Sequence, residues 1–415
     1  MARFVIFTQR FYPEDTVMNH VAEELVARNH EVTVMTGLPN APAGRLFEGY
    51  GYLRRLSENW RGIDIRRNWL VPRGDGSPIR LAINYASFAI SATSMLTRLR
   101  GKEPNVIFVN QATPITQAIP AVVYKAITGA PLVMWIHDLW PESLQSSGAV
   151  DNAWALAQVG RLVDFIYSRC DLIFVQSEAM RPMVEARAVY PNQIEYLPNL
   201  LDMQFEASTK DIQESFDLDL PTDAFVVMFA GALGRSHALD TVIEAARQIH
   251  GQGYTKVHWV FAGDGSNRRK AEELVERFGL QGQVHFLGYL PVELMPSLYA
   301  TADVMLATLS NEPIFHLTVP LKIHSYLASG TPIICGVGGE ATRIVADAGA
   351  GFTFEPEDVE GLVACIRNAL ALGPEQLQEI GMRGQEYFEA NYTRDRVMEK
   401  MIKRINQLEG VFLPT

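Results

Sequence analysis

Short apolar runs alternate with helix-length amphipathic segments along the whole of this 415-residue chain. The first series of runs covers 3–8, 31–37, 106–111, 131–136 and 172–177. A second series covers 224–234, 257–266, 284–290, 302–309 and 331–339. Such alternation is typical of open parallel sheets with helices on both faces. We therefore predict an α/β protein built on doubly wound parallel sheets.

The two series are separated near residues 195–202, where Pro198 and Asn199 interrupt the pattern. A chain of this length is too long for one ordinary core, which favours two domains. We expect a first domain over 1–200 and a second over 201–390. A C-terminal helix within 391–415 is expected to pack back on the first domain.

Many of the runs end in Gly, Asp, Ser or Asn, which places polar loops at the carboxyl ends of the strands, where open α/β sheets bind ligands. The segment Gly231–Arg235 is one such loop: its glycines let the backbone approach a ligand, and Arg235 can bind phosphate with two hydrogen bonds. Gly263-Asp264-Gly265 is a second. Purely steric strand endings are the alternative. The chain has no G-x-G-x-x-G or P-loop motif, which disfavours NAD binding and P-loop chemistry.

Two further segments carry charged side chains next to apolar runs. Lys322 follows Pro320 at the expected start of a helix, where a cation opposes the helix dipole, so an anionic partner would explain it. A solvated surface lysine is the alternative. His137, Asp138 and Glu142 follow the run at 131–136. They are either a satisfied strand end or part of an active site.

Charge is distributed unevenly in this acidic chain, whose formal net charge is −11. Residues 45–102 contain eleven basic and four acidic side chains, and the stretch 81–97 within them carries no charge. That stretch is too short and too polar to span a membrane. It is either a buried helix under a basic surface or a peripheral contact with an anionic leaflet. No nucleic-acid-binding motif accompanies it.

Cysteine usage and the N-terminus bear on the compartment. Three scattered cysteines imply no disulfide framework, and the first residues lack the features of a signal peptide. We expect a cytoplasmic protein, with peripheral binding to the inner face of the cytoplasmic membrane through residues 45–102.

Eight segments in order resemble the retaining, family 4 type of GT-B glycosyltransferase over nearly the whole chain. They are NHVAEELVARNHEVTVMTG, HDLWPES, FVQSEAM, LPNLLD, FAGALGRSHALDTVIEAA, FAGDG, VHFLGYLPVELMPSLYATADVML and PLKIHSYLASGTPIICGVGGEATRIV. No single segment is decisive, but the ordered set is specific. HDLWPES and the PLK segment look most like a branch that builds bacterial O-antigen, capsule or exopolysaccharide, with N-acetylfucosamine-type transferases closest.

The resemblance implies two Rossmann-like domains facing across a cleft, a nucleotide diphosphate-sugar donor held mostly by the second domain, and an acceptor on the first. Arg235 and Lys322 match a cationic pair that holds the diphosphate without a metal, an arrangement that can stabilise the leaving charge. His137 matches a histidine beside the transferred sugar. The implied donor-binding set is Gly234, Arg235, Gly263, Asp264, Tyr289, Lys322, Gly338, Gly339 and Glu340. No cofactor is implied, and UDP is the expected product.

The chain departs from the family pattern in three places. The loop before the first helix lacks the usual glycine pair; there Thr16 could cap the helix, and Asn19 and His20 are weaker contact candidates. The usual pair of glutamates is missing: Ser325 takes the second place, and His316 or Glu312 lies near the first. A lysine soon after Arg235 is also absent, which puts more weight on Lys322.

These features together predict a retaining glycosyltransferase. It would move a sugar, which we expect to be an N-acetylated amino sugar, from a UDP-sugar to a lipid-linked saccharide in bacterial surface polysaccharide synthesis. His137 would position the sugar or the acceptor, with Asp138 and Glu142 as rivals for a base. The alternatives are a nucleotide-sugar epimerase of the same architecture, which would need carboxylates as acid and base, and a catalytically silent nucleotide-sugar-binding subunit.

Overall fold

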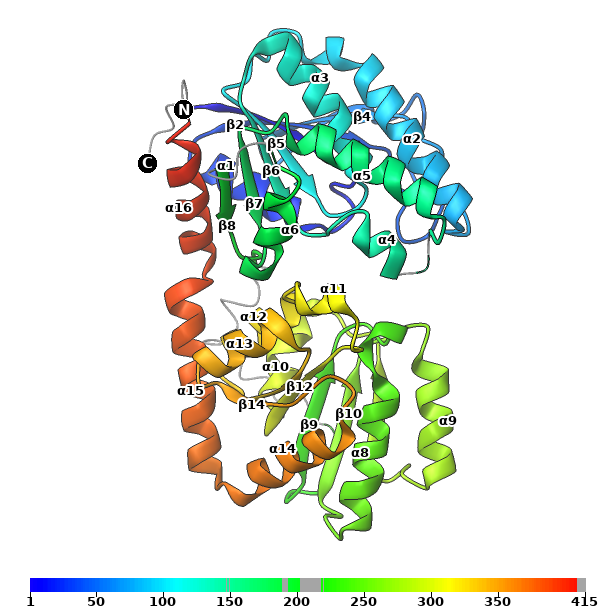
Figure 1. Cartoon of the computed structure of the whole chain (residues 1–415), viewed down its shortest axis with the longest axis vertical. Coiled ribbons are helices and arrows are strands. Elements are labelled where there is room, and N and C mark those ends of the chain that lie inside the picture. Colours follow the sequence, from blue (N-terminus) through cyan, green and yellow to red (C-terminus); the bar gives the residue numbers. More distant parts are fainter. Residues whose placement is uncertain (147, 149, 189–192, 202–217, 219, 409–415) are drawn as a thin grey trace. The chain divides into compact units, whose positions relative to one another are not determined.

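The computed structural model describes residues 1–146, 148, 150–188, 193–201, 218 and 220–408 (Figure 1). The chain divides into two compact units. The first unit comprises Met1–Leu200 together with Asp395–Thr415, and the second comprises Leu201–Arg394. Each unit is a sheet covered by helices, which confirms the predicted fold class.

The sheet of the first unit has the strand order β3-β4-β2-β1-β5-β6-β7-β8. Its strands are β1 (Arg3–Phe7), β2 (Glu31–Gly37), β3 (Ser57–Trp60), β4 (Ile63–Asn68), β5 (Val106–Gln111), β6 (Leu132–Ile136), β7 (Leu172–Val175) and β8 (Ile194–Tyr196). The pairs are parallel except β3 with β4, which are antiparallel. The chain adds strands outward from β1 on one side and from β5 on the other, so the strand order reverses between β1 and β5.

Helices cover both faces of this sheet. They are α1 (Val17–Ala27), α2 (Pro78–Ser94), α3 (Ile119–Thr128), α4 (Glu142–Ser146), α5 (Ala153–Tyr167), α6 (Arg181–Glu185) and α16 (Arg394–Ile405). One apolar core joins α1 and α16 to the sheet, and α16 contributes Val397, Met398 and Met401 to it. Figure 1 shows α2, α3 and α5 together on the other side of the sheet. Residues 409–415 of the expected C-terminal segment lie outside the described residues.

The second sheet has the order β11-β10-β9-β12-β13-β14, with parallel pairs throughout. Its strands are β9 (Phe225–Ala230), β10 (Val257–Ala262), β11 (Val284–Gly288), β12 (Val304–Thr308), β13 (Ile333–Gly336) and β14 (Gly351–Thr353). On one face lie α8 (Leu239–Gly251), α9 (Arg268–Phe278) and α14 (Val359–Ala371). On the other lie α10 (Met295–Tyr299), α12 (Leu321–Ser329), α13 (Gly339–Asp347) and α15 (Pro374–Asn391). The strand order reverses between β9 and β12.

The hairpin formed by β3 and β4 buries or pairs part of the basic charge of residues 45–102. Arg67 is fully buried in β4, where it pairs with Glu58 and donates to the Tyr12 carbonyl at 2.6 Å. Arg66 and Lys102 share one carboxylate, that of Asp64, at 2.9 and 3.3 Å. The basic surface of this region is therefore smaller than its composition suggests.

The uncharged stretch at 81–97 forms most of α2, and this helix is buried on one side only. It buries Asn84, Ser87 and Phe88 but leaves Ile79 and Ile90 exposed by 75% and 64%. Ile83, 44% exposed, lies between them at helical spacing. The helix is therefore buried on one face and presents an apolar stripe on the other.

Candidate active site

The reversal of strand order in the second sheet places two loops side by side at its carboxyl edge, the position where such sheets bind ligands. One loop follows β9 and holds Gly231–Ala238; the other follows β12. The amide of Ser310 donates to the Ser236 carbonyl at 2.8 Å, and the Thr308 hydroxyl donates to the His237 carbonyl at 2.7 Å. These bonds fix the Arg235 loop against the second strand of the pair.

Lys322 brings an unpaired amine to this edge. Its Nζ lies 3.6 Å from the centroid of the Phe229 ring and has no hydrogen-bond partner in the described part of the chain. Burial lowers its pKa to about 7. A Cβ on Gly231 would lie 3.3 Å from the amine, so the glycine keeps this side of Lys322 open. A buried amine in this state can take up a proton when an anion arrives.

Arg235 and His237 stand on a short 3-10 turn, Arg235–His237, after Gly234. Arg235 is exposed, and no ion pair to it is formed within the described ranges. The Gly234 amide donates to His237 Nδ1 at 3.3 Å, so the proton of the neutral ring is on Nε2. Burial, and then the charge of Lys322, lower the pKa of His237 to about 4. His237 is therefore a neutral hydrogen-bond donor beside Lys322.

The second glycine-rich strand end packs directly against the backbone of the first. A Cβ on Gly263, whose φ is +141°, would lie 1.9 Å from the Gly231 carbonyl oxygen. A Cβ on Gly265 would lie 2.6 Å from the Leu233 backbone. Asp264 is exposed, and its carboxylate accepts the Gly265 amide at 2.7 Å. The steric alternative thus explains these glycines, which let the two loops touch.

The other residues of the expected donor-binding set lie at further loops of the same edge. Tyr289 follows β11 and is 80% exposed. Gly338 and Gly339 precede and begin α13 with φ of +81° and +53°, and a Cβ on Gly339 would meet the His316 backbone at 2.0 Å. The Glu340 carboxylate is buried and accepts two bonds from Arg343, at 2.6 and 3.2 Å. Glu340 is therefore engaged within its own helix.

The three candidates for the places of the missing glutamate pair each make separate, local contacts. His316 Nε2 lies 3.0 Å from Asn311 Oδ1. Glu312 is exposed at the start of α11 (Pro313–His316). The Ser325 hydroxyl is buried and donates to the Leu321 carbonyl of its own helix at 3.3 Å. Ser325 thus serves a helix backbone contact.

In the first unit, His137 directly follows β6. Its Nδ1 lies 2.8 Å from Asn199 Oδ1, an acceptor, so Nδ1 carries the proton. Its Nε2 is buried and has no partner among the described residues. Burial lowers the pKa of His137 to about 4, although the bond to Asn199 opposes this shift. The ring is therefore neutral, with a free acceptor at Nε2.

The two carboxylates beside His137 both already have hydrogen-bond or ion-pair partners. The Asp138 carboxylate accepts the Thr113 hydroxyl at 2.7 Å, the Trp140 indole at 3.3 Å and the Ser143 hydroxyl. Glu142 pairs with Arg187 at 2.9 Å. These contacts favour roles for both carboxylates in shaping the 137–143 loop.

The loop before α1 is held together by its own side chains. Thr16 makes no capping bond, which corrects that expectation; its hydroxyl donates to Asn19 Oδ1 at 3.0 Å. Asn19 is buried and donates to the Glu14 carbonyl at 2.9 Å. His20 lies 3.8 Å from both Asp15 and Glu23.

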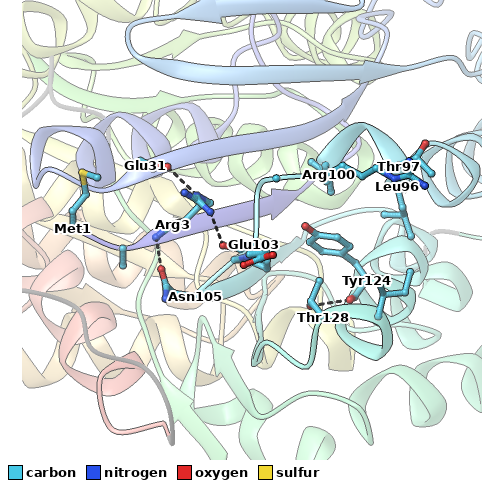
Figure 2. Close-up of a pocket in the computed structure, with 15 residues that line it drawn as sticks. Met1, Arg3, Glu31, Leu96, Thr97, Arg100, Glu103, Asn105, Tyr124 and Thr128 are labelled. Carbon is cyan, nitrogen blue, oxygen red and sulfur yellow. Dashed lines mark hydrogen bonds and ion pairs between the residues drawn. The ribbon is translucent and has the colours of Figure 1, made fainter.

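A cavity of about 980 Å³ lies at the opposite, amino-terminal edge of the first sheet (Figure 2). In its lining, Arg3 forms an ion pair with Glu31 at 2.9 Å and donates to the Glu103 backbone carbonyl at 3.0 Å. The Tyr124 hydroxyl donates to the Lys102 carbonyl at 3.1 Å. Because ligands of open α/β sheets bind at the carboxyl edge, we do not place the active site here.

Two family models match the chain in succession. Residues 15–200 match the glycosyl transferase 4-like domain, and residues 210–387 match glycosyl transferases group 1. A protein of Escherichia coli strain K12 named as the colanic acid biosynthesis glycosyl transferase WcaI is 24% identical, over 97% of this chain and 99% of its own.

Solved structures with the same fold cover nearly the whole chain. Sucrose-phosphate synthase from Thermosynechococcus elongatus superposes with a TM-score of 0.74 at 17% identity, covering 98% of this chain and 99% of its own. HepE of Anabaena, solved in complex with UDP, gives a TM-score of 0.70 at 14% identity, covering 98% and 100%. The chain therefore has the GT-B fold of these structures, and the two family models that it matches are models of glycosyltransferases. It joins a glycosyl transferase 4-like domain to a group 1 domain.

The residues that the structure describes, 1–408 with the gaps given above, show neither a metal-ligand cluster nor a membrane-spanning helix. They contain no group of three or more His, Cys, Asp or Glu side chains arranged to hold a metal ion. Within the same residues, no helix has the length and apolar character needed to cross a bilayer.

Proposed function

We propose that this glycosyltransferase moves a sugar, with retention of configuration and without a metal ion, from a UDP-sugar to a lipid-linked saccharide. We assign it to bacterial surface polysaccharide synthesis, which the name of the colanic acid relative supports. The complex of HepE with UDP supports the donor. The observation that carries the proposal is the buried amine of Lys322 beside the Arg235 loop, which has no hydrogen-bond partner among the residues that the structure describes.

The departing diphosphate needs cations where its charge develops. Arg235 offers a planar fork for two phosphate oxygens, and Lys322 offers a point charge in a desolvated place. His237 adds a neutral donor at Nε2. Together these three side chains would hold the donor diphosphate and stabilise it as the bond to the sugar breaks.

His137 would position a sugar hydroxyl. Its Nε2 lone pair is free, and the neutral ring cannot donate from that atom. Asp138 and Glu142 are already bonded to neighbouring side chains, which argues against the acid and base pair that an epimerase would need. We assign the transferred sugar as an N-acetylated amino sugar on the family resemblance alone.

Peripheral membrane contact fits the surface of the first unit. The apolar stripe of α2 is accompanied by exposed Trp154 and Phe165 on α5. The basic region 45–102 also has exposed arginines, among them Arg45, Arg54 and Arg80. Aromatic and apolar side chains with arginines around them are the composition of surfaces that lie in the interface of an anionic membrane.

The donor assignment is tested by thermal shift with UDP and by turnover of a UDP-sugar. Wild-type protein should be stabilised by UDP in proportion to its affinity. Arg235→Ala and Lys322→Ala should each weaken UDP binding by about tenfold or more, because each removes a charge-assisted contact of about 1.5–3 kcal/mol. Arg269→Ala, on the exposed side of α9, is the control. Unchanged UDP affinity in both site variants would refute the diphosphate assignment.

A further inference from the structure

The ladder between β9 and β12 stops before β9 ends. β12 pairs with Val227 and Met228 of β9, and β9 then continues to Ala230. On its other side β9 stays paired with β10 as far as Ala230. A buried backbone amide and carbonyl need hydrogen-bond partners. The Ala230 groups that β12 does not bind must therefore find theirs elsewhere, at the point where the strand order of the second sheet reverses.

The phenol of Tyr326 supplies both partners. Its hydroxyl accepts the Ala230 amide at 3.0 Å and donates to the Ala230 carbonyl at 3.1 Å. The side chain is fully buried in α12, and burial raises the pKa of Tyr326 well above its ordinary value, so the hydroxyl keeps the proton that it donates. A side chain thus takes the place of a neighbouring strand at the carboxyl end of β9.

The residues that flank Ala230 in the sequence both contact the Lys322 amine. The centroid of the Phe229 ring lies 3.6 Å from Nζ, and a Cβ on Gly231 would lie 3.3 Å from it. Lys322 lies one turn before Tyr326 on α12, so the two side chains share a face of that helix. Tyr326 therefore holds the segment 229–231 against the helix that carries the amine.

The environment of the amine depends on this segment. Burial lowers the pKa of Lys322, and its titratable neighbour His237 is neutral. Without the phenol hydroxyl, the Ala230 amide and carbonyl would be buried without partners, a costly state that a protein relieves by moving the backbone or by admitting water. Either change would hydrate the amine and displace the ring and the glycine beside it.

We propose that Tyr326 is a positioning residue, which fixes the segment 229–231 and through it the Lys322 amine for the donor diphosphate. The inference rests on the proposed function and adds to it a residue that acts through the backbone. Tyr326 is fully buried and packs in the apolar core of the second unit, where a phenylalanine ring would fill the same space. The hydroxyl therefore serves the backbone of β9 and not the packing of the core.

The first test measures the ligand-free, full-length protein. NMR titration of lysines labelled with ¹³C at Cε follows the amine, and Lys322→Met assigns its signal. In Tyr326→Phe the pKa of Lys322 should rise from about 7 towards the ordinary lysine value of about 10.4, because the amine becomes hydrated.

Tyr299→Phe is the matched control. It removes the hydroxyl of another buried tyrosine in the same core, whose ring lies edge-on to Tyr326 with centroids 5.5 Å apart. The pKa of Lys322 should not change in this variant. An unchanged pKa in Tyr326→Phe, or an equal rise in both variants, would overturn the proposal.

UDP titrations give the second readout. Tyr326→Phe should weaken UDP binding by about tenfold, and the double variant Lys322→Met, Tyr326→Phe should bind UDP within about twofold of Lys322→Met alone, because the phenol acts through the amine. Losses that add in the double variant would overturn this link. Absence of UDP binding by the wild type would instead refute the proposed function, whereas the pKa comparison would still decide the role of Tyr326.

Hydrogen exchange of the wild-type protein tests the same bonds without a variant, in case Tyr326→Phe does not fold. The Ala230 amide should exchange as slowly as the amide of Met228, which lies where β9 is paired on both sides. Exchange of Ala230 much faster than that of Met228 would show that the phenol does not hold the strand end, and would overturn the proposal.

Discussion

Lys322 illustrates how a single side chain is prepared for a charged ligand. The amine is buried against Phe229 and has no hydrogen-bond partner in the described part of the chain. Burial lowers its pKa to about 7. A diphosphate nearby would favour the charged form and raise that pKa again. In the free protein the amine is therefore largely neutral at mildly alkaline pH, and it becomes a cation when the donor binds.

This state predicts proton uptake on UDP binding. At pH 8 the amine is mostly neutral, so binding should take up a substantial fraction of a proton; at pH 6 it is already charged, and uptake should be small. Calorimetric titrations in buffers of different ionisation enthalpy measure the uptake directly. Lys322→Met should abolish it at pH 8. Equal uptake in the variant and the wild type would contradict the assignment to Lys322.

His324 gives a second prediction at the scale of one residue. It is fully buried on α12, packs against Tyr392 with ring centroids 4.4 Å apart, and has no hydrogen-bond partner at either ring nitrogen among the described residues. Burial lowers its pKa to about 4. Because the unfolded chain binds the proton more readily, stability is lost as the pH falls from about 6.5 towards about 4.

The loss attributable to His324 is on the order of 3 kcal/mol, at about 1.4 kcal/mol per pKa unit. His324→Phe should keep the packing on Tyr392 and remove this contribution. Urea unfolding of the second unit at pH 7.5 and pH 4.5 would measure it. An acid loss as large in His324→Phe as in the wild type would show that other groups are responsible.

At the scale of the element, α2 links sequence composition to a surface. Its apolar positions divide between a buried face and an exposed stripe that carries Ile79, Ile83 and Ile90. Composition alone predicted an uncharged helix but not which side it would bury, because that depends on the residues packed against it. Asn84 and Ser87 lie on the buried side, where they bond the 71–73 segment.

The double substitution Ile83→Glu and Ile90→Glu should weaken binding to anionic vesicles by about tenfold or more, since each buried isoleucine contributes about 1.5–3 kcal/mol. Co-sedimentation with phosphatidylglycerol-containing vesicles at low salt measures it. Ile127→Glu is the control, because Ile127 is 67% exposed on α3 at the amino-terminal cavity. An equal loss in the control would indicate a general charge effect instead of a docking stripe.

The loop after β10 yields a further prediction. Gly263→Ala would place a methyl group 1.9 Å from the Gly231 carbonyl, so the Arg235 loop must move. We expect UDP affinity to fall by about tenfold or more, given the 1–3 kcal/mol that strained backbone commonly costs. Gly253→Ala is the matched control, since its φ is +90° but its Cβ would meet nothing within 4 Å. Equal effects on UDP titrations would exclude the steric mechanism.

Much of the architecture was predictable because strands buried on both faces read as unbroken apolar runs. The hairpin of β3 and β4 was missed, since charges alternate along it and Arg67 is buried against expectation. At the candidate site, glycines at a strand end indicated the Arg235 loop, and a lysine at the expected start of a helix indicated Lys322. His237 was missed, because only the folded turn brings its ring to the Gly234 amide and the Lys322 amine.

At the scale of the whole molecule, each unit offers a carboxyl edge where its strand order reverses, one with the Arg235 loop and one with the loop that begins at His137. The first unit is not continuous in sequence, however. Its core includes Val397, Met398 and Met401 of α16, which follow the entire second unit along the chain.

This order has a consequence for synthesis on the ribosome. The amino-terminal half emerges first, yet the part of one sheet face that α16 covers beside α1 stays exposed until α16 has been translated. Residues 1–200 made alone should therefore expose that face and aggregate, and a peptide spanning 394–408 should restore solubility when supplied in trans. The N-terminal unit of this enzyme cannot finish folding before its C-terminal unit has been made.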